Sequence, residues 1–286
     1  MRNLMWNQAM RNIRNHHNTW RGIVIFLAIT VIFSAVFWNL MISAGSLDSA
    51  GGLYTLGLMW CPGVAALATV ALERRPLTCL GWRPGRPRYL LTAYLLPLFY
   101  AGLPYAALWL TGVTGFTLDA LPQALSLPIF LAFNLTAGFL GSLISALGEE
   151  IGWRGFLVPE LARMMRPRWA ALISGTIWAL WHYPILLLAG YHGTAPIAFG
   201  LVCFTVMVVA LSLPFAWLRL ASGSLWTAAL LHASHNLIIQ QVLDPLTAST
   251  GWALYLTGEF GLTLALAALI VGWLFWRLPE AGLASR

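Results

Sequence analysis

The chain has 286 residues, of which 59% are hydrophobic and only 9% are charged. An average soluble domain has roughly 25% charged residues, so this composition excludes a water-soluble globular protein and indicates an exterior that faces lipid. The net charge of +7 comes from arginine, because the sequence contains no lysine. These arginines lie between apolar segments rather than in a basic stripe of the kind that binds nucleic acid, and we expect no nucleic-acid partner.

Eight apolar stretches are long enough to cross a bilayer as helices, which requires about 20 residues each. In chain order they span residues 22–44, 53–72, 89–110, 128–157, 169–188, 195–218, 223–242 and 252–276. The first stretch exceeds the apolar core of a cleaved signal peptide, which has about 7–15 residues, so we expect it to remain in the protein. We expect residues 1–21 before it to form a cytoplasmic segment at the membrane surface.

The distribution of the arginines supports this layout. If the N-terminus is cytoplasmic and successive connections alternate between the two sides, every arginine falls on the cytoplasmic side. The connections on the other side contain Asp48, Asp119 and Asp244 and no arginine. This is the asymmetry of the positive-inside rule. It predicts one all-α integral-membrane domain over residues 1–286, a polytopic transmembrane bundle of about eight helices with both termini cytoplasmic, in the inner (plasma) membrane.

Few ionisable side chains lie inside the predicted spans, and each costs several kcal/mol there unless it is paired or faces water. They are therefore candidates for function: Glu149, Glu150, Arg154, His182, His232, His235 and Glu259, with Asn236 beside them. At a rise of 1.5 Å per residue, Glu149 lies roughly 15 Å from the cytoplasmic end of its helix, His182 roughly 20 Å and His232 roughly 14 Å. We therefore expect one shared site in the cytoplasmic half of the bilayer.

Local spacing suggests how these groups pair. Glu150 and Arg154 are four residues apart on one helix and can form an ion pair, which would leave Glu149 free. Trp178 and His182 have the same spacing, so the indole can pack on the imidazole and fix its orientation.

The last histidines divide between two helix faces. His232 and Asn236 share a face because they are four residues apart, whereas His235 points away by about 60°. We expect His235 to be structural, and Glu259, near the outer end of the last span, to be structural or interfacial.

These residue types indicate hydrolysis without a serine or cysteine nucleophile. A shielded carboxylate beside an imidazole can act as a general base on water, and a histidine with an asparagine can stabilise an oxyanion. Alternatively, Glu149, His182 and His232 could hold a zinc ion with one open position. The HExxH spacing of soluble zinc proteases is absent.

Three short segments resemble the motifs of a known family. Residues 149–154, EEIGWR, are similar to the EExxxR motif of the CPBP (Abi) family of intramembrane proteases, which includes the type II CAAX prenyl proteases. Residues 178–182, WALWH, resemble its FxxxH motif with tryptophan in place of phenylalanine, and residues 232–236, HASHN, resemble its HxxxN motif. The similar layout extends over residues 128–243, which would contain the catalytic helices.

The resemblance implies that Glu149 and His182 activate the attacking water and that His232 and Asn236 stabilise the oxyanion. Members of the family have been described both as metalloproteases and as metal-free glutamate proteases. The asparagine suits an oxyanion site better than zinc ligation, so we expect no cofactor, with zinc as the alternative. The remaining motif residues would be structural or would orient the substrate: Glu150, Arg154 and Trp178.

The leading functional hypothesis is an intramembrane endopeptidase that cleaves a peptide or protein substrate near the cytoplasmic membrane face. Two alternatives stay open on the sequence. One is a non-catalytic immunity or scaffold protein in which the polar groups hold helices together. The other is a transporter with a proton-coupled glutamate–histidine relay, although the sequence shows no obvious inverted repeat.

Overall fold

The computed structural model describes residues 2–47, 49–119, 121, 126–193, 195–248 and 251–280, and for residues 2–18 and 49 it describes the backbone alone. Within these residues the regular structure is helical, apart from one isolated β-bridge between Phe116 and Thr247. The all-α prediction is confirmed.

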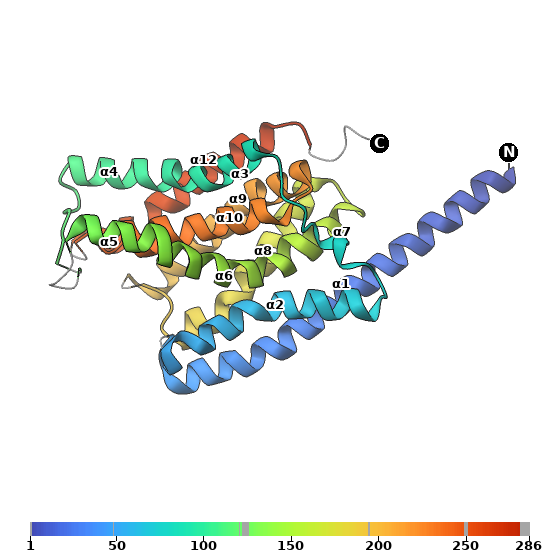
Figure 1. The fold of residues 1–286 in the computed structure, drawn as a ribbon, viewed down its shortest axis with the longest axis horizontal. Coiled ribbons are helices and arrows are strands. Elements are labelled where there is room, and N and C mark those ends of the chain that lie inside the picture. Colours follow the sequence, from blue (N-terminus) through green and yellow to red (C-terminus); the bar gives the residue numbers. More distant parts are fainter. Residues whose placement is uncertain are drawn as a thin grey trace.

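The helices pack side by side as a bundle, with α1 and α2 together along one edge (Figure 1). The first half of the chain contains α1 (Arg2–Ala44), α2 (Leu53–Leu72), α3 (Pro87–Pro97), α4 (Leu103–Leu110), α5 (Leu127–Phe133), α6 (Phe139–Glu150) and α7 (Val158–Ala162). The second half contains α8 (Pro167–Leu188), α9 (Ile197–Ser222), α10 (Leu225–Asn236), α11 (Ala253–Leu256) and α12 (Leu262–Arg277).

Several of these helices are joined end to end by π-helical turns and form longer rods. The π-helical turns are η3 (Leu98–Gly102), η4 (Asn134–Gly138), η5 (Ile151–Leu157) and η6 (Leu237–Leu243). Short 3-10 helices, η1 (Ser49–Gly52) and η2 (Leu77–Leu80), lie in the connections. As a result, each of the eight predicted spans coincides largely with helical structure.

Six helical segments of the described chain are long and apolar enough to cross a membrane: Thr19–Ala44, Ala50–Leu72, Pro87–Leu110, Leu127–Ala162, Pro167–Leu188 and Ile197–Ser222. The other two predicted spans do not meet that standard. The seventh is polar around its histidines, and the eighth is a shorter apolar helix, Leu262–Arg277.

The predicted span over residues 252–276 is wrong in its first part. The chain leaves the helix after Leu256, because Thr257 is extended and Gly258 takes a left-handed conformation with φ of 74°. Glycine adopts this conformation without the steric cost that a side chain imposes. The helix restarts as α12 at Leu262, so Glu259 lies in a break between helices rather than inside a span.

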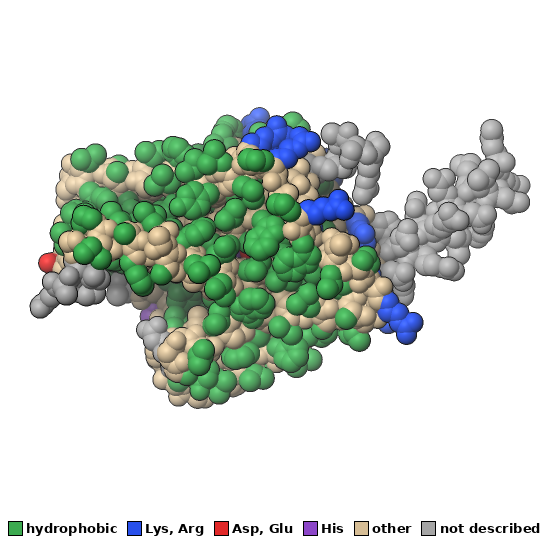
Figure 2. Space-filling model, in the orientation of Figure 1, with side chains coloured by type: hydrophobic (Ala, Val, Ile, Leu, Met, Phe, Trp, Pro, Cys, Tyr) green, Lys and Arg blue, Asp and Glu red, His purple; other side chains and the backbone are tan. Residues whose placement is uncertain are grey.

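The arginines gather at one end of the bundle (Figure 2). This arginine end contains the chain after α2, with Arg74 and Arg75, the start of α8, beside Arg168, and the end of α12, at Arg277. The opposite, arginine-free end contains the α1–α2 connection and the break before α12. Asp48 lies outside the described residues. The alternation of sides agrees with the sequence prediction, and the cytoplasmic placement of the arginine end stays a prediction.

Two glycines allow the α6–η5 rod to pack closely against α2. A Cβ atom on Gly148 would lie 2.7 Å from Cγ of Trp60, and one on Gly152 would lie 2.5 Å from Cβ of Pro62. Small residues four apart permit such backbone contact between membrane helices. Because Glu149 and Glu150 lie between these glycines, the contact fixes both carboxylates relative to α2.

We predict that Gly152→Ala destabilises the protein, because the added methyl group overlaps Pro62. Overpacking of this kind costs about 1–3 kcal/mol, and thermal unfolding in detergent measures it as a lower Tm. Gly102→Ala is the matched control, because its Cβ would meet Leu98 at an ordinary 3.5 Å. Equal Tm values for Gly152→Ala and the wild type would show that the contact is not tight.

Candidate active site

The predicted catalytic side chains come from three rods that meet inside the bundle. Glu149 lies at the end of α6, His182 in α8, and His232 and Asn236 in α10. The π-helical turns η5 and η6 begin directly after Glu150 and Asn236. Wide turns of this type occur frequently at functional sites, because the extra residue redirects the side chains on either side of it.

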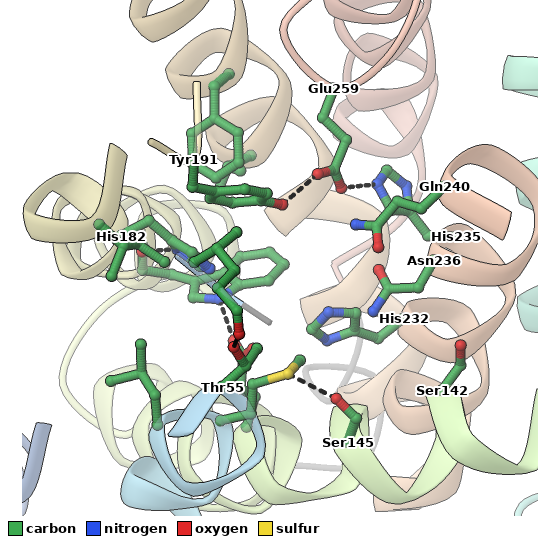
Figure 3. Close-up of a pocket in the computed structure, with 18 of the residues that line it drawn as sticks. Thr55, Ser142, Ser145, His182, Tyr191, His232, His235, Asn236, Gln240 and Glu259 are labelled. Carbon is green, nitrogen blue, oxygen red and sulfur yellow. Dashed lines mark hydrogen bonds and ion pairs between the residues drawn. The ribbon is translucent and has the colours of Figure 1, made fainter. Parts of the chain in front are cut away.

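All four residues line one cavity of about 400 Å³ (Figure 3). This volume falls within the range of about 300–1,000 Å³ that small-molecule sites occupy. One wall is apolar and comes mainly from α9, including Phe204, Met207, Val208 and Leu211. The structure therefore brings the predicted residues together, while their individual roles stay predictions.

Glu149 is a buried carboxylate that has no cationic partner. Its side chain is 1% exposed. Oε2 accepts hydrogen bonds from the indole N–H groups of Trp178, at 2.6 Å, and Trp153, at 3.3 Å. Within the described residues it makes no ion pair, and Oε1 makes no hydrogen bond. Oε1 is therefore the atom that can accept a proton from a molecule in the cavity.

Trp178 contacts both His182, as the sequence predicted, and Glu149, which it did not. Its ring packs edge-on against His182 at 6.0 Å between centroids, as expected from their spacing. Sequence reasoning missed the indole N–H that Trp178 donates to Glu149. The signal was the tryptophan in place of the usual phenylalanine, since this substitution adds a hydrogen-bond donor.

Glu150 and Arg154 form the predicted ion pair, with 2.8 Å between Glu150 Oε1 and Arg154 Nη1. The guanidinium is completely buried and lies between the rings of Trp178, at 4.0 Å, and Phe215, at 4.2 Å. Arg154 does not line the cavity, so it neutralises one of two adjacent carboxylates and does not contact a substrate there.

His232 has a partner that the sequence did not predict. Its Nδ1 lies 2.9 Å from Glu150 Oε1, and because a carboxylate accepts, Nδ1–H is the donor. The other ring nitrogen, Nε2, can donate to an oxyanion when the ring is protonated.

His182 is held in one tautomer. Nδ1 lies 2.9 Å from the carbonyl oxygen of Trp178 and donates to it, which leaves the lone pair of Nε2 free. Trp181, at 4.7 Å, and Phe204, at 5.2 Å, pack edge-on against the ring. An imidazole fixed in this way can accept a proton or orient a water molecule.

Asn236 lines the cavity next to His232 (Figure 3). The residue is 8% exposed, and its amide makes no hydrogen bond within the described part of the chain. Buried amides usually have a partner, so this group is available to a bound molecule.

A second polar cluster lies further along the cavity. His235 Nε2 is 2.8 Å from Glu259 Oε1, its Nδ1 is 2.5 Å from the hydroxyl of Tyr100, and Tyr191 donates to Glu259 Oε2 at 2.5 Å. Burial raises the pKa of Glu259, but the hydrogen bonds from His235 and Tyr191 outweigh burial and hold this pKa below its usual range. His235 is engaged on both nitrogens, as a structural residue would be, yet it and Glu259 also line the cavity.

The cavity leads toward the arginine-free end. Its lining there includes Leu47 and Gly52 from the α1–α2 connection, Tyr191 after α8 and Glu259 before α12. Figure 2 shows the surface hollowed between the α1–α2 edge and the rest of the bundle. Glu149 and His232 lie on the arginine side of their rods' midpoints, whereas the lining extends to the arginine-free end. The cytoplasmic location of the reaction stays a prediction.

Residues 127–238 match the family model of the Rce1-like type II CAAX prenyl endopeptidases. The match covers less than half of the chain, and it is the part that holds the predicted site. No curated protein matches the chain. The matched region extends from α5 into η6 and contains all seven predicted motif residues, whereas Glu259 lies beyond it. The resemblance recognised in the sequence is confirmed over these residues, and the apolar helices are those of a multi-pass membrane protein.

The described residues contain no preformed group of side chains that could coordinate zinc. Within the described residues, no three His, Cys, Asp or Glu side chains are grouped closely enough to hold a metal ion. Glu149 faces two indole N–H groups, and Nδ1 of both His182 and His232 is occupied. A zinc ion at this site would therefore have to bind the two Nε2 atoms and Glu149 Oε1. An activity assay with a chelator tests this possibility.

We predict that Glu150→Gln destabilises the fold much more than Glu149→Gln. Removing the partner of a buried charge costs about 3–5 kcal/mol, and Arg154 would be left without an anion, whereas Glu149 has no cation to lose. Thermal unfolding of the two variants in detergent gives the comparison.

A double variant checks the cause. Replacing the pair together, as Glu150→Leu with Arg154→Met, removes both charges, and we expect it to recover part of the lost stability. If Glu150→Gln unfolds at the wild-type temperature, the ion pair does not hold the site.

Proposed function

We propose that the protein is an intramembrane endopeptidase that hydrolyses a peptide bond inside the cavity with a water molecule activated by Glu149 and His182. The observation that supports this most is the state of Glu149: it is buried and free of any cation, and one oxygen remains open to the cavity. The family match over residues 127–238 supports the same reaction class.

The proposed steps follow from the positions of the donors and acceptors. Glu149 takes a proton from the water that His182 orients, and the water oxygen bonds to the carbonyl carbon. The amide of Asn236 and the Nε2–H of protonated His232 donate to the resulting oxyanion. The carbon–nitrogen bond then breaks, and the proton held by Glu149 passes to the leaving amine.

The architecture supports a particular route for the substrate. Since the cavity opens at the arginine-free end, we propose that the peptide enters from that end and that the reaction takes place near mid-depth in the bundle. The apolar wall from α9 suits hydrophobic side chains of the peptide, and the opposite wall, with Ser142, Ser145 and Asn236, suits its backbone.

We predict that Glu149→Gln and His182→Ala each lower kcat for a fluorogenic peptide by at least about 100-fold, the usual contribution of a general base. Both variants should stay folded, because neither residue takes part in the Glu150–Arg154 pair. Glu280→Gln is a control: this carboxylate lies at the arginine end, 3.5 Å from Arg168.

Repeating the assay with a chelator separates the two catalytic types. A metal-free enzyme keeps its activity, whereas a zinc enzyme loses it and regains it when zinc is returned. Full activity of either variant would refute the proposal and favour the non-catalytic scaffold.

A further inference from the structure

Glu259 presents a fixed carboxylate to the cavity. Tyr191 donates to its Oε2 and His235 to its Oε1, and the side chain of Gln240 is a third hydrogen-bond partner. A carboxylate offers about four acceptor positions, so one remains for a ligand. Figure 3 shows Glu259 between these partners, on the same side of the cavity as Asn236 and Gln240.

The segment that carries Glu259 is itself clamped. Tyr105 donates its hydroxyl proton to Asp244, and the same hydroxyl oxygen accepts the backbone N–H of Gly258 at 2.6 Å. The break in the helix is therefore tied to α4 and to the end of η6. A group held in place in this way binds a ligand at low entropic cost.

Among the described residues, Glu259 has no arginine or lysine partner, and its charged-group partner is His235. The hydroxyl of Tyr100 has His235 Nδ1 as its partner. The other nitrogen, Nε2, lies 2.8 Å from Glu259 Oε1, so the ring is held between the hydroxyl and the carboxylate.

The described lining of the cavity contains two carboxylates, Glu149 and Glu259, and neither arginine nor lysine. Arg154 is enclosed behind Trp178 and Phe215 and is paired with Glu150. In a bundle of low dielectric the charge of Glu259 attracts a cation to its part of the cavity and repels an anion.

The unpartnered amide of Asn236 links this charge to the reacting position. Asn236 is adjacent in sequence to His235, which holds Glu259. Asn236 and Glu259 line the same cavity (Figure 3), so a peptide with its scissile bond at Asn236 places neighbouring side chains in the cavity that Glu259 lines.

We propose that Glu259 is a recognition residue that binds a basic side chain of the substrate, close to the scissile bond. This rests on the proposed protease function. We therefore expect the enzyme to cleave peptides with arginine or lysine at one position more efficiently than neutral ones, and peptides with a carboxylate there less efficiently.

The test uses the purified full-length protein and N-acetylated fluorogenic peptides. Each peptide has a single arginine at one position within four residues of the scissile bond. Its partners have citrulline, the neutral analogue of arginine, or glutamate there. We expect kcat/KM to be about tenfold higher for arginine than for citrulline at one position, a factor that corresponds to about 1.4 kcal/mol, and lowest for glutamate.

The assignment to Glu259 is tested by Glu259→Gln. This variant should cleave the citrulline peptide and lose the arginine preference. Asp119→Asn is the matched control, since it removes an exposed carboxylate at the same end, outside the cavity lining, and should keep the preference. If Glu259→Gln does not fold, Glu259→Asp replaces it; withdrawing the charge by one methylene should reduce the preference.

The outcomes are separable. Cleavage of none of the peptides by the wild type contradicts the proposed function itself. Equal cleavage of the arginine and citrulline peptides at every position leaves the protease intact and overturns the recognition site, as does an arginine preference that persists without the Glu259 charge.

Discussion

The ion pair between Glu150 and Arg154 is the interaction on which the rest of the site depends. Neither side chain is exposed to solvent, and burying the two charges separately would cost several kcal/mol each. Pairing within one helix turn, with Trp178 and Phe215 against the guanidinium, makes this burial tolerable. It also distinguishes two adjacent glutamates, since Glu150 is neutralised and Glu149 is not.

The same pair organises a second helix. Glu150 accepts hydrogen bonds from His232 as well as from Arg154, so this carboxylate also positions α10. Glu149 is left to the two indole N–H groups, which hold it without neutralising it. Of the two adjacent glutamates, one thus holds neighbouring helices together and the other has no cationic partner.

Much of the fold could be predicted from the sequence, because a helix that crosses a bilayer needs about 20 mostly apolar residues. The predicted span over residues 53–72 coincides with α2, and the Glu150–Arg154 pair followed from spacing within one helix. Contacts between helices were harder. The bond between His232 and Glu150 joins residues 82 positions apart, and helical periodicity cannot pair them.

The remaining differences between prediction and structure have two causes, a local break in a helix and the packing of helix ends. The apolar stretch over residues 252–276 looked continuous, but the left-handed Gly258 breaks it and brings Glu259 to the cavity. The direction in which the cavity opens also depends on three-dimensional packing, because it is determined by which helix ends stay apart. Depth along each helix placed the predicted catalytic residues at a common level, but it could not predict the direction in which the cavity opens.

The most direct test of the account is peptide hydrolysis by protein reconstituted in proteoliposomes with a known orientation. A peptide that cannot cross the bilayer is supplied on one side only, and the orientation is determined from the accessibility of a tag at the N-terminus, which precedes α1. The account predicts hydrolysis when the peptide is on the side opposite the tag, where the arginine-free end lies. Hydrolysis from the side of the tag alone, or from neither side, would contradict it.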